Sequence, residues 1–224
     1  MIGLQILKRQ RAVDLVLAER FRAVPVANVS DCMSRMTAGG ARLRPMHEGG
    51  YMAGPALTVK VRPGDNLLVH KALQMAVPGD VIIVDAGGDL TNAIVGEIMV
   101  GDAVRRKLGG MVIDGAVRDA NAIRSGSFPV FAAGVTHRGP YKDGPGEINV
   151  PIAIDGMVVC PGDLIIGDDD GILCVPFDQA EVLLAAGLLK GLAETKMISD
   201  MASGKYDAGW IDANLKRIGW IEAQ

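Results

Sequence analysis

The sequence predicts a mixed α/β sandwich, a mixed β-sheet with flanking helices, that carries a helical arm at its C-terminal end. In the first two thirds of the chain, segments with helical spacing alternate with apolar strands. Residues 150–176 then hold four short apolar runs separated by Asp-Gly, Pro-Gly-Asp and Asp-Asp-Gly turns, the pattern of consecutive strands. From Gln179 onward the sequence is again helical and polar. This order favours an α/β or mixed sandwich over a purely doubly wound sheet.

Helices and strands alternate in the N-terminal part. Residues 10–22 place apolar residues among arginine and glutamate at helical spacing and predict an amphipathic helix. A second short helix is expected to start at residues 28–31, where serine and aspartate are good N-cap types. A strand is predicted at 52–61, a helix at 66–76 and a strand at 80–85.

The segment 96–108 predicts a well-terminated helix. Three cations fall in its last turn, where they offset the negative end of the helix dipole, and Gly109 suits the left-handed position that follows. Glu97 is thereby placed in the first turn. Further strands are predicted at 111–113 and 128–135.

The tripeptide Pro-Gly-Asp occurs at 63–65, 78–80 and 161–163, and twice it leads directly into an apolar strand. Proline and glycine supply the backbone angles of a type II turn. We therefore interpret the three copies as turns and assign them no catalytic role.

The chain is expected to divide into an α/β domain, residues 1–180, and a C-terminal helical oligomerisation arm, residues 181–224. The arm contains both tryptophans, and a monomer would expose Trp210, Ile211 and Trp220 to water. We therefore expect the arm to pack on a neighbouring subunit.

The composition is typical of a globular protein and lacks the excess of basic residues found in nucleic-acid-binding proteins. The 224 residues are 49% hydrophobic, enough to bury a core. The 23 basic and 26 acidic residues give a net charge of -3, so binding driven by nucleic-acid phosphates is not expected. Aromatic residues make up 4%, too few for base-stacking platforms. A small molecule or another protein is the expected partner.

The cysteines are Cys32, Cys160 and Cys174, far apart and without a CxxC pair. This spacing argues against a disulfide framework and a structural zinc site, and reduced thiols suggest a cytoplasmic protein. The N-terminal segment lacks the apolar run and cleavage site of a secretory signal, and no run is long enough for a membrane-spanning helix.

Spacing disfavours several common cofactor sites. The sequence DAGGD at 85–89 lacks the third glycine of a dinucleotide fingerprint and the Gly-Lys-Ser/Thr ending of a phosphate loop, and a methyl-donor loop is only a loose match. The histidines His47, His70 and His137 form no i, i+4 pair, which disfavours zinc. A metal is expected to be hard and bound through oxygen, which indicates Mg²⁺ or Mn²⁺.

Arg118 and Asp119 directly follow the apolar run in VIDGAVRD. A carboxylate just after a strand lies where open α/β sheets place ligand-binding groups, and Mg²⁺ is typically held by one or two carboxylates and waters. The adjacent guanidinium could bind a carboxylate or a developing enolate. From the residue chemistry alone, the alternative also stands that Arg118 and Asp119 form a surface ion pair in an exposed turn.

The pattern GEIM…VIDGAVRD resembles the RraA-like family, which includes metal-dependent (class II) pyruvate aldolases that cleave 4-hydroxy-4-methyl-2-oxoglutarate and 4-carboxy-4-hydroxy-2-oxoadipate. The family signature is an acidic residue, twenty intervening residues and then Arg-Asp; here it is Glu97, twenty residues and Arg118-Asp119. The resemblance covers roughly residues 25–180. It implies a fold resembling the swivelling phosphohistidine domain of pyruvate phosphate dikinase, assembled as a homotrimer or a homohexamer (a dimer of trimers).

The resemblance implies a role for each matching position. Asp119 is implied to be the metal ligand, partly through waters, and Arg118 to contact the keto oxygen and stabilise the pyruvate enolate. Backbone amides at the predicted helix start are implied to bind the pyruvyl carboxylate, as a helix N-terminus can; they belong to Gly96, Glu97, Ile98 and Met99. Glu97 replaces the aspartate of many members, and its longer side chain is expected to move its contact to the metal-bound water.

Further positions carry open alternatives. Lys142 lies where the aldolases use a lysine for the distal carboxylate, and a solvated loop lysine is the alternative. His137 and Arg138, in the same loop, could set a different substrate. The aldolases also contribute a carboxylate from the C-terminal region of a neighbouring subunit; Glu194 is the candidate for the metal site, and a solvent-facing helix residue is the alternative.

The implied activity is divalent-metal-dependent cleavage of the C3–C4 bond of a 4-hydroxy-2-oxo acid, which yields pyruvate and a second keto acid. The same enolate chemistry would allow oxaloacetate decarboxylation. The competing interpretation is a protein-binding regulator of the RNase E inhibitor type, because that inhibitor also keeps an acidic residue and Arg-Asp.

Overall fold

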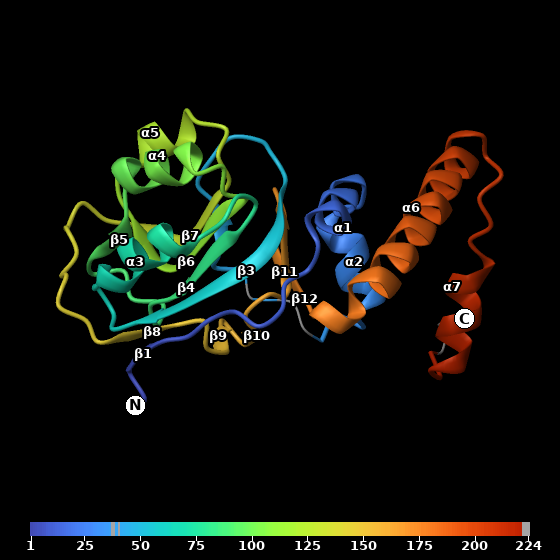
Figure 1. The fold of residues 1–224 in the computed structure, drawn as a ribbon. Helices are drawn as coiled ribbons and strands as arrows, with labels where there is room; N and C mark the ends of the chain where they lie inside the picture. Colours follow the sequence, from blue (N-terminus) through green and yellow to red (C-terminus); the bar gives the residue numbers. More distant parts are fainter. Residues whose placement is uncertain (37–38, 40, 221–224) are drawn as a thin grey trace.

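A computed structural model describes residues 1–36, 39 and 41–220, and one large mixed sheet forms its centre (Figure 1). The strands are β1 (Leu4–Ile6), β2 (Arg44–Pro45), β3 (Met52–Val61), β4 (Val81–Asp85), β5 (Ala93–Val95), β6 (Gly110–Val117), β7 (Val130–Val135), β8 (Gly146–Ile148), β9 (Ile152–Ile154), β10 (Met157–Val159), β11 (Leu164–Asp168) and β12 (Gly171–Val175). The sheet order is β1-β8-β3-β4-β6-β7-β2, with β5 beside β6 and the β11–β12 pair beside β3. The strands β9 and β10 form a separate hairpin.

Helices lie on both sides of this sheet (Figure 1). The helices α3 (Leu67–Met75), α4 (Glu97–Arg105) and α5 (Ala120–Arg124) lie on one side, and α1 (Leu15–Arg20), α2 (Val26–Cys32) and α6 (Ala180–Ala202) form a layer beyond β11 and β12. The last helix, α7 (Gly209–Arg217), lies away from the sheet.

The central strands are buried on both faces. Successive side chains of a strand point to opposite faces, so Ile82 and Ile113 enter the core under α3 and α4, whereas Ile83 and Val112 enter the core shared with the β9–β10 hairpin. A third core, around Phe21, joins β11 and β12 to the helical layer. Burial on both faces explains why these strands read as nearly continuous apolar runs.

Most long elements match the sequence-based predictions. The strands predicted at 52–61 and 80–85 and the helix predicted at 66–76 are confirmed as β3, β4 and α3 within one residue at each end. The four short strands expected in 150–176 are β9 to β12. The Pro-Gly-Asp copies are turns, since Gly64, Gly79 and Gly162 have left-handed φ values of 77°, 88° and 89°.

The N-terminal helices begin at other residues than predicted. The Asp14 side chain accepts a hydrogen bond from Val16 N at 2.8 Å and caps α1, so the helix is shorter than the predicted 10–22. The predicted start of the second helix at 28–31 is wrong, because α2 begins at Val26 after Pro25. Proline suits this place, where a backbone N–H has no partner within the helix.

The predicted end of the helix at 96–108 is also wrong in detail. The left-handed residue after α4 is Lys107, with φ 60°, and Gly109 has no left-handed backbone. Gly109 is required for a different reason, because a Cβ atom there would lie 2.6 Å from the Gly79 carbonyl oxygen. The helix therefore stops earlier, and β6 begins at Gly110.

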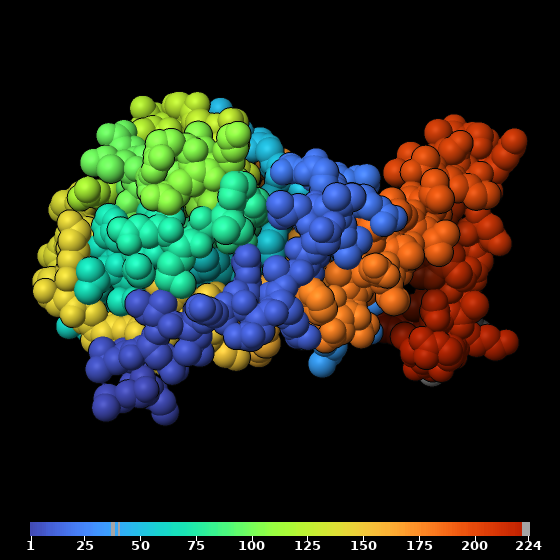
Figure 2. Space-filling view, in the orientation of Figure 1, coloured from blue at the N-terminus to red at the C-terminus, as the bar shows by residue number. Residues whose placement is uncertain are grey.

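The C-terminal helices project from the body as an arm (Figure 2). The first turns of α6 pack against the helical layer through Leu183 and Leu184, whereas Leu189, Leu192 and Ile198 are between 67% and 69% exposed. The boundary at residue 180 and the oligomerisation role of residues 181–224 remain predictions. Across the described residues, each helix is too short or too polar to cross a bilayer.

Glycine substitutions in β3 and α4 are expected to have opposite effects on stability. A Cβ at Gly54 would lie 2.1 Å from the Gly79 carbonyl oxygen, so Gly54→Ala should lower the free energy of unfolding by about 2 kcal/mol or more. Gly101 in α4 has no atom within 4 Å of an added Cβ, so Gly101→Ala should raise it by about 0.5–1 kcal/mol. Urea unfolding followed by circular dichroism measures both; shifts of the same sign would contradict this packing.

Candidate active site

A helical crossover explains the twenty-residue step between Glu97 and Arg118. The strands β5 and β6 are parallel neighbours with Val95 opposite Val117, and α4 connects them. Their carboxyl ends therefore coincide, and Arg118 N donates a hydrogen bond to Val95 O at 2.9 Å. Open α/β sheets place ligands at such strand ends. The chain thus brings the residues after β5 beside those after β6.

The Asp119 carboxylate is fixed at this corner. Its Oδ2 accepts a hydrogen bond from Glu97 N at 3.0 Å, and Arg118 Nε lies 3.6 Å from the same oxygen. The residue has a left-handed backbone, with φ 57° and ψ 38°, which aspartate tolerates better than most residues. Asp119 Oδ1 accepts no hydrogen bond from any described residue, so it is open to a ligand.

Gly96 allows this contact to form. A Cβ atom at this position would lie 2.4 Å from Asp119 Oδ2 and 2.9 Å from Arg118 Cγ. Both distances are below van der Waals contact, so any side chain at residue 96 would displace the arginine and the aspartate together. The glycine in GEIM is therefore a requirement of the site rather than of a turn.

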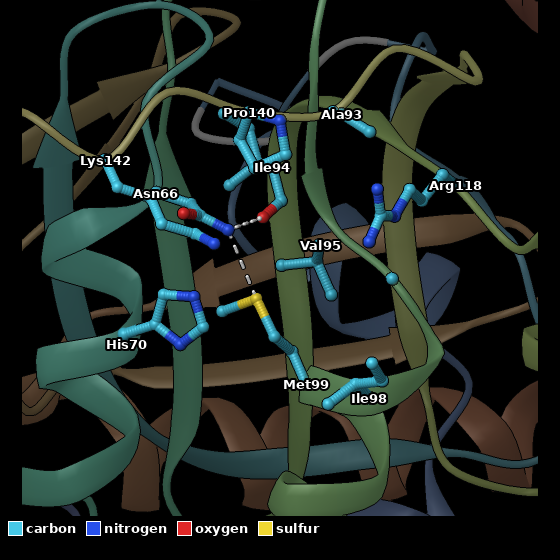
Figure 3. Close-up of a pocket in the computed structure, with 12 residues that line it drawn as sticks. Asn66, His70, Ala93, Ile94, Val95, Ile98, Met99, Arg118, Pro140 and Lys142 are labelled. Carbon is cyan, nitrogen blue, oxygen red and sulfur yellow. Dashed lines mark hydrogen bonds between the residues drawn. The ribbon is translucent and has the colours of Figure 1, made fainter.

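A pocket of about 350 Å³ opens beside this corner. Its polar side chains are Asn66, His70, Arg118 and Lys142. Arg118 stands on one side, and the other three gather on the opposite side with Val95 and Met99 between them (Figure 3). The pocket therefore has two polar ends separated by an apolar middle.

Asn66 is a buried polar side chain with an unused acceptor. It is 3% exposed, and its Nδ2 donates to Ile94 O at 2.9 Å and lies 3.4 Å from Met99 Sδ. Its Oδ1 is buried and accepts no hydrogen bond from the described residues. A buried acceptor left without a partner is costly, so Oδ1 is suited to a donor supplied by a ligand.

His70 is held in its neutral form. Burial lowers its pKa below the ordinary value of about 6.5, the positive charge of Lys142 lowers it further, and Asp102 partly opposes both effects. A neutral imidazole at pH 7 keeps one ring nitrogen able to accept a proton.

The first turn of α4 has two uncommitted backbone amides. Glu97 N donates to Asp119, and Met99 N donates to Gly96 O at 3.1 Å. The amides of Gly96 and Ile98 donate to no acceptor in the described part of the chain, and both residues line the pocket. Of the four amides predicted to bind an anion, two are thus already paired within the chain and two are available at the positive end of the helix dipole; anion binding there remains a prediction.

The structure brings most of the predicted site residues together. Gly96, Ile98, Met99, Arg118 and Lys142 line one pocket. Glu97 and Asp119 have exposed side chains and do not line this pocket, but they are joined by the hydrogen bond from the Glu97 backbone amide to the Asp119 carboxylate. His137 and Arg138 are exposed and do not line it.

Glu194 lies elsewhere in the same chain. It is on α6, where it accepts a hydrogen bond from Asn28 Nδ2 at 2.8 Å and pairs with Lys190 at 3.1 Å. The Lys190 hydrogen bond and the Asn28 amide keep the pKa of Glu194 below its ordinary value, so it is ionised. Its predicted role in the site of a neighbouring subunit remains a prediction.

Asn66 and His70 were missed by the sequence reasoning. They are four residues apart, so they lie on one face at the start of α3. That spacing was the available signal, but an asparagine at a helix start and a single histidine are both common without function. This face of α3 becomes part of a pocket only because Arg118 and Lys142, which are distant in the sequence, lie beside it in the fold.

The donor groups fit a hydrated hard cation. Among the described residues, no group of three or more His, Cys, Asp or Glu side chains converges on a metal position, so the protein does not supply a complete ligand set there. Mg²⁺ and Mn²⁺ need few protein ligands, because they retain waters and bind through one or two carboxylates. Asp119, with an open oxygen beside the exposed Glu97, matches this requirement.

Comparison with known proteins identifies the class. The family model described as Aldolase/RraA matches residues 26–174, about two thirds of the chain. The chain therefore belongs to the RraA-like family, and the fold class predicted from the sequence is confirmed.

Individual relatives extend this result. The chain is 42% identical over 175 residues to a Halalkalibacterium halodurans protein provisionally named 4-hydroxy-4-methyl-2-oxoglutarate aldolase, covering 78% of this chain and 82% of that protein. It is 36% identical over 124 residues to the 4-hydroxy-4-methyl-2-oxoglutarate aldolase of Thermus thermophilus, and the match covers 55% of this chain and 75% of that protein. The solved structure of a Thermus RNA-processing inhibitor, RraA, superposes with a TM-score of 0.63 at 31% identity. The superposition covers 68% of this chain and 92% of the Thermus protein.

Gly96→Ala is expected to damage the site without unfolding the protein. The added Cβ displaces Asp119 and Arg118, so binding of Mn²⁺, followed by electron paramagnetic resonance, should weaken at least about tenfold. Gly126→Ala is the matched control, because an added Cβ there meets only ordinary contacts of 3.5 Å or more. Equal Mn²⁺ affinity in both variants would contradict the assignment.

Proposed function

We propose that this protein is a divalent-metal-dependent aldolase that cleaves a 4-hydroxy-2-oxo acid to pyruvate and a second 2-oxo acid. Relatives named as aldolases support the reaction class. The observation that carries the proposal is the pocket with two polar ends, since Arg118 faces a group formed by Asn66, His70 and Lys142. A substrate with a carboxylate at each end and a hydroxyl between them would bind to both polar ends of the pocket.

The Arg118 end binds the pyruvyl half of the substrate. The uncommitted amides of Gly96 and Ile98 donate to its carboxylate, and the guanidinium of Arg118 donates to the 2-oxo oxygen. Hydrogen bonds from fixed donors strengthen as negative charge develops on that oxygen. This end therefore favours the enolate over the bound ketone.

The opposite end binds the half that leaves. The ammonium of Lys142 pairs with the distal carboxylate, and Asn66 Oδ1 accepts a hydrogen bond from the C4 hydroxyl. His70, neutral at pH 7, accepts the proton of that hydroxyl when the bond breaks. Each group is thereby matched to the part of the substrate that its chemistry can bind.

The bond changes balance within the substrate. The C4 hydroxyl loses its proton, the C4–O bond becomes a carbonyl, and the C3–C4 bond breaks. The electron pair moves through C3 and C2 onto the 2-oxo oxygen beside Arg118, and protonation at C3 then gives pyruvate. A divalent cation, Mg²⁺ or Mn²⁺, held by Asp119 with Glu97 beside it, would supply polarisation of the 2-oxo group.

The same groups would act on oxaloacetate. Loss of carbon dioxide from its C4 leaves the same three-carbon enolate, which Arg118 and the α4 amides stabilise equally. We therefore propose oxaloacetate decarboxylation as a second activity. It needs no proton acceptor for a hydroxyl, so it depends less on Asn66 and His70.

A protein-binding regulator of the RNase E inhibitor type is the second candidate. It is favoured by the likeness to the Thermus protein described as an RNA-processing inhibitor. Purified protein would be tested by RNase E pull-down and inhibition. The two-ended pocket favours the aldolase, because a protein-binding surface alone gives no reason for polar side chains at opposite ends of one cavity.

We also propose that the assembly is a homotrimer or homohexamer in the cytoplasm. The exposed apolar residues of α6 and α7 support packing of the arm on another subunit. In such an assembly Glu194 of one subunit would contribute its carboxylate to the site of the next. Size-exclusion chromatography with light scattering measures the subunit number.

The metal-dependent aldolase activity has a direct test. Pyruvate release from 4-hydroxy-4-methyl-2-oxoglutarate and from oxaloacetate should require Mg²⁺, stop with EDTA, and fall at least about 100-fold in Asp119→Ala and in Arg118→Lys. Asp169→Ala, which removes an exposed carboxylate from the β11–β12 turn, should leave turnover unchanged. If EDTA or Asp119→Ala leaves turnover intact, the proposal fails.

The pH profile should report His70. Its pKa is lowered, so the neutral form persists until the pH falls below about 6.5, and kcat/KM for the 4-hydroxy substrate should decline only below that point. Lys142→Met removes a positive charge that lowers the pKa, so the declining limb should move to higher pH. His70→Asn should abolish the limb. A limb unchanged in both variants would assign the titration to another group.

A further inference from the structure

The three Pro-Gly-Asp copies have the same turn but use their aspartates differently. Asp65, Asp80 and Asp163 are all buried, at 0%, 1% and 4% exposure. Asp80 accepts a hydrogen bond from Val77 N at 3.0 Å and Asp163 from Cys160 N at 2.9 Å, each three residues earlier. These two carboxylates close their own turns. Among the described residues, Asp65 accepts no hydrogen bond from a backbone amide earlier in its own turn; its contact three residues back is with the Arg62 side chain.

The Asp65 carboxylate instead joins two segments that are far apart in the sequence. Its Oδ2 accepts hydrogen bonds from Asp143 N at 2.7 Å and Gly144 N at 2.9 Å, and Arg62 Nη2 lies 3.2 Å from it. Its Oδ1 accepts one from Leu67 N at 3.0 Å. One buried side chain thus accepts hydrogen bonds from backbone donors of both segments.

Both segments carry pocket groups. Leu67 is the first residue of α3, between Asn66 and His70, and Asp143 directly follows Lys142. The same junction is reinforced by backbone hydrogen bonds from Tyr141 N to Gly64 O at 2.8 Å and from Asn66 N to Tyr141 O at 3.0 Å. The distal polar end therefore depends on how the loop at 139–146 is docked against the start of α3.

The carboxylate cannot be replaced by its amide without loss. Burial raises the pKa of Asp65, but hydrogen bonds from three backbone amides and the charge of Arg62 outweigh it, so the pKa is lowered and the group is ionised. In Asp65→Asn one acceptor becomes an NH₂ donor facing backbone N–H groups. That change breaks at least one buried hydrogen bond and adds a donor–donor contact.

We propose that Asp65 is a positioning residue for the distal end of the pocket: it holds the loop that carries Lys142 against the start of α3, where Asn66 and His70 lie. The loop has its own apolar and polar neighbours, but the carboxylate is the group that fixes the backbone immediately after the lysine. The kinetic part of this inference rests on the proposed aldolase function.

A double-mutant cycle with the 4-hydroxy substrate tests this role. Asp65→Asn should raise KM about tenfold and lower kcat less than about threefold, because the loop that binds the distal carboxylate is displaced. In a Lys142→Met background the same substitution should raise KM no more than about twofold, since the group that it positions is already gone. A tenfold effect in both backgrounds would overturn the proposal.

Asp163→Asn is the matched control. It removes a buried Pro-Gly-Asp carboxylate whose backbone donors, Cys160 and Phe177, are remote from the pocket. It should lower the melting temperature as Asp65→Asn does, but leave KM unchanged. An equal rise of KM in the control would show a general loss of stability and would overturn the positioning role.

Hydrogen–deuterium exchange gives a readout that is independent of turnover. The peptide covering residues 138–146 should exchange at least about tenfold faster in Asp65→Asn than in wild type, and no faster in Asp163→Asn. If wild type shows no aldolase turnover, the proposed function fails, whereas unchanged exchange of this peptide in Asp65→Asn overturns the loop-positioning role itself. The two failures are therefore distinguishable.

Should Asp65→Asn fail to fold, Arg62→Met takes its place. It removes one donor to Asp65 and the guanidinium that lies 5.7 Å from the Tyr141 ring centroid, but it keeps every backbone hydrogen bond of the junction. A rise in KM of about threefold, with faster exchange of the 138–146 peptide, would support the proposal. No change in either would overturn it.

Discussion

The hydrogen bond from the Glu97 amide to the Asp119 carboxylate is the contact on which the rest of the site depends. It forms only because residue 96 has no side chain and because Asp119 accepts a left-handed backbone. The contact places a carboxylate at the positive end of α4, which stabilises the helix start. It also uses one amide of the first turn and thereby leaves those of Gly96 and Ile98 for a ligand.

The two ends of the pocket have separate structural origins. The Arg118 end is built by β5, α4 and β6, a crossover whose parallel pairing fixes it within the sheet. The opposite end is built by α3 and the loop at 139–146, which meet through side-chain and backbone hydrogen bonds rather than through the sheet. Substitutions can therefore alter the distal end while the sheet-bound corner is preserved, which suits a family whose members carry different names and activities.

The sequence predicts what local spacing encodes and misses what distant contacts decide. Periodicity identified the long elements, and the family signature of Glu97, twenty residues and Arg118-Asp119 indicated the corner, which the structure builds with the crossover helix α4. The strand Ala93–Val95 was missed, since three residues become a strand only by pairing with β6. Asp65 was read only as part of a turn, because its loop partners lie 78 and 79 residues away.

Charge balance links the two ends in the proposed reaction. In that proposal Arg118 supplies a positive charge beside the 2-oxo oxygen and Lys142 one for the distal carboxylate, and Asp119 with Glu97 would supply two negative charges for one divalent cation. His70 adds no charge before the bond breaks because its pKa is lowered, and it becomes charged only when it accepts the hydroxyl proton. Cleavage of C3–C4 leaves one carboxylate on each product, so each product retains one cationic partner. In the proposed reaction the distal product thereby loses its covalent link to the enolate, and solvent screening of its ion pair with Lys142 then allows it to leave.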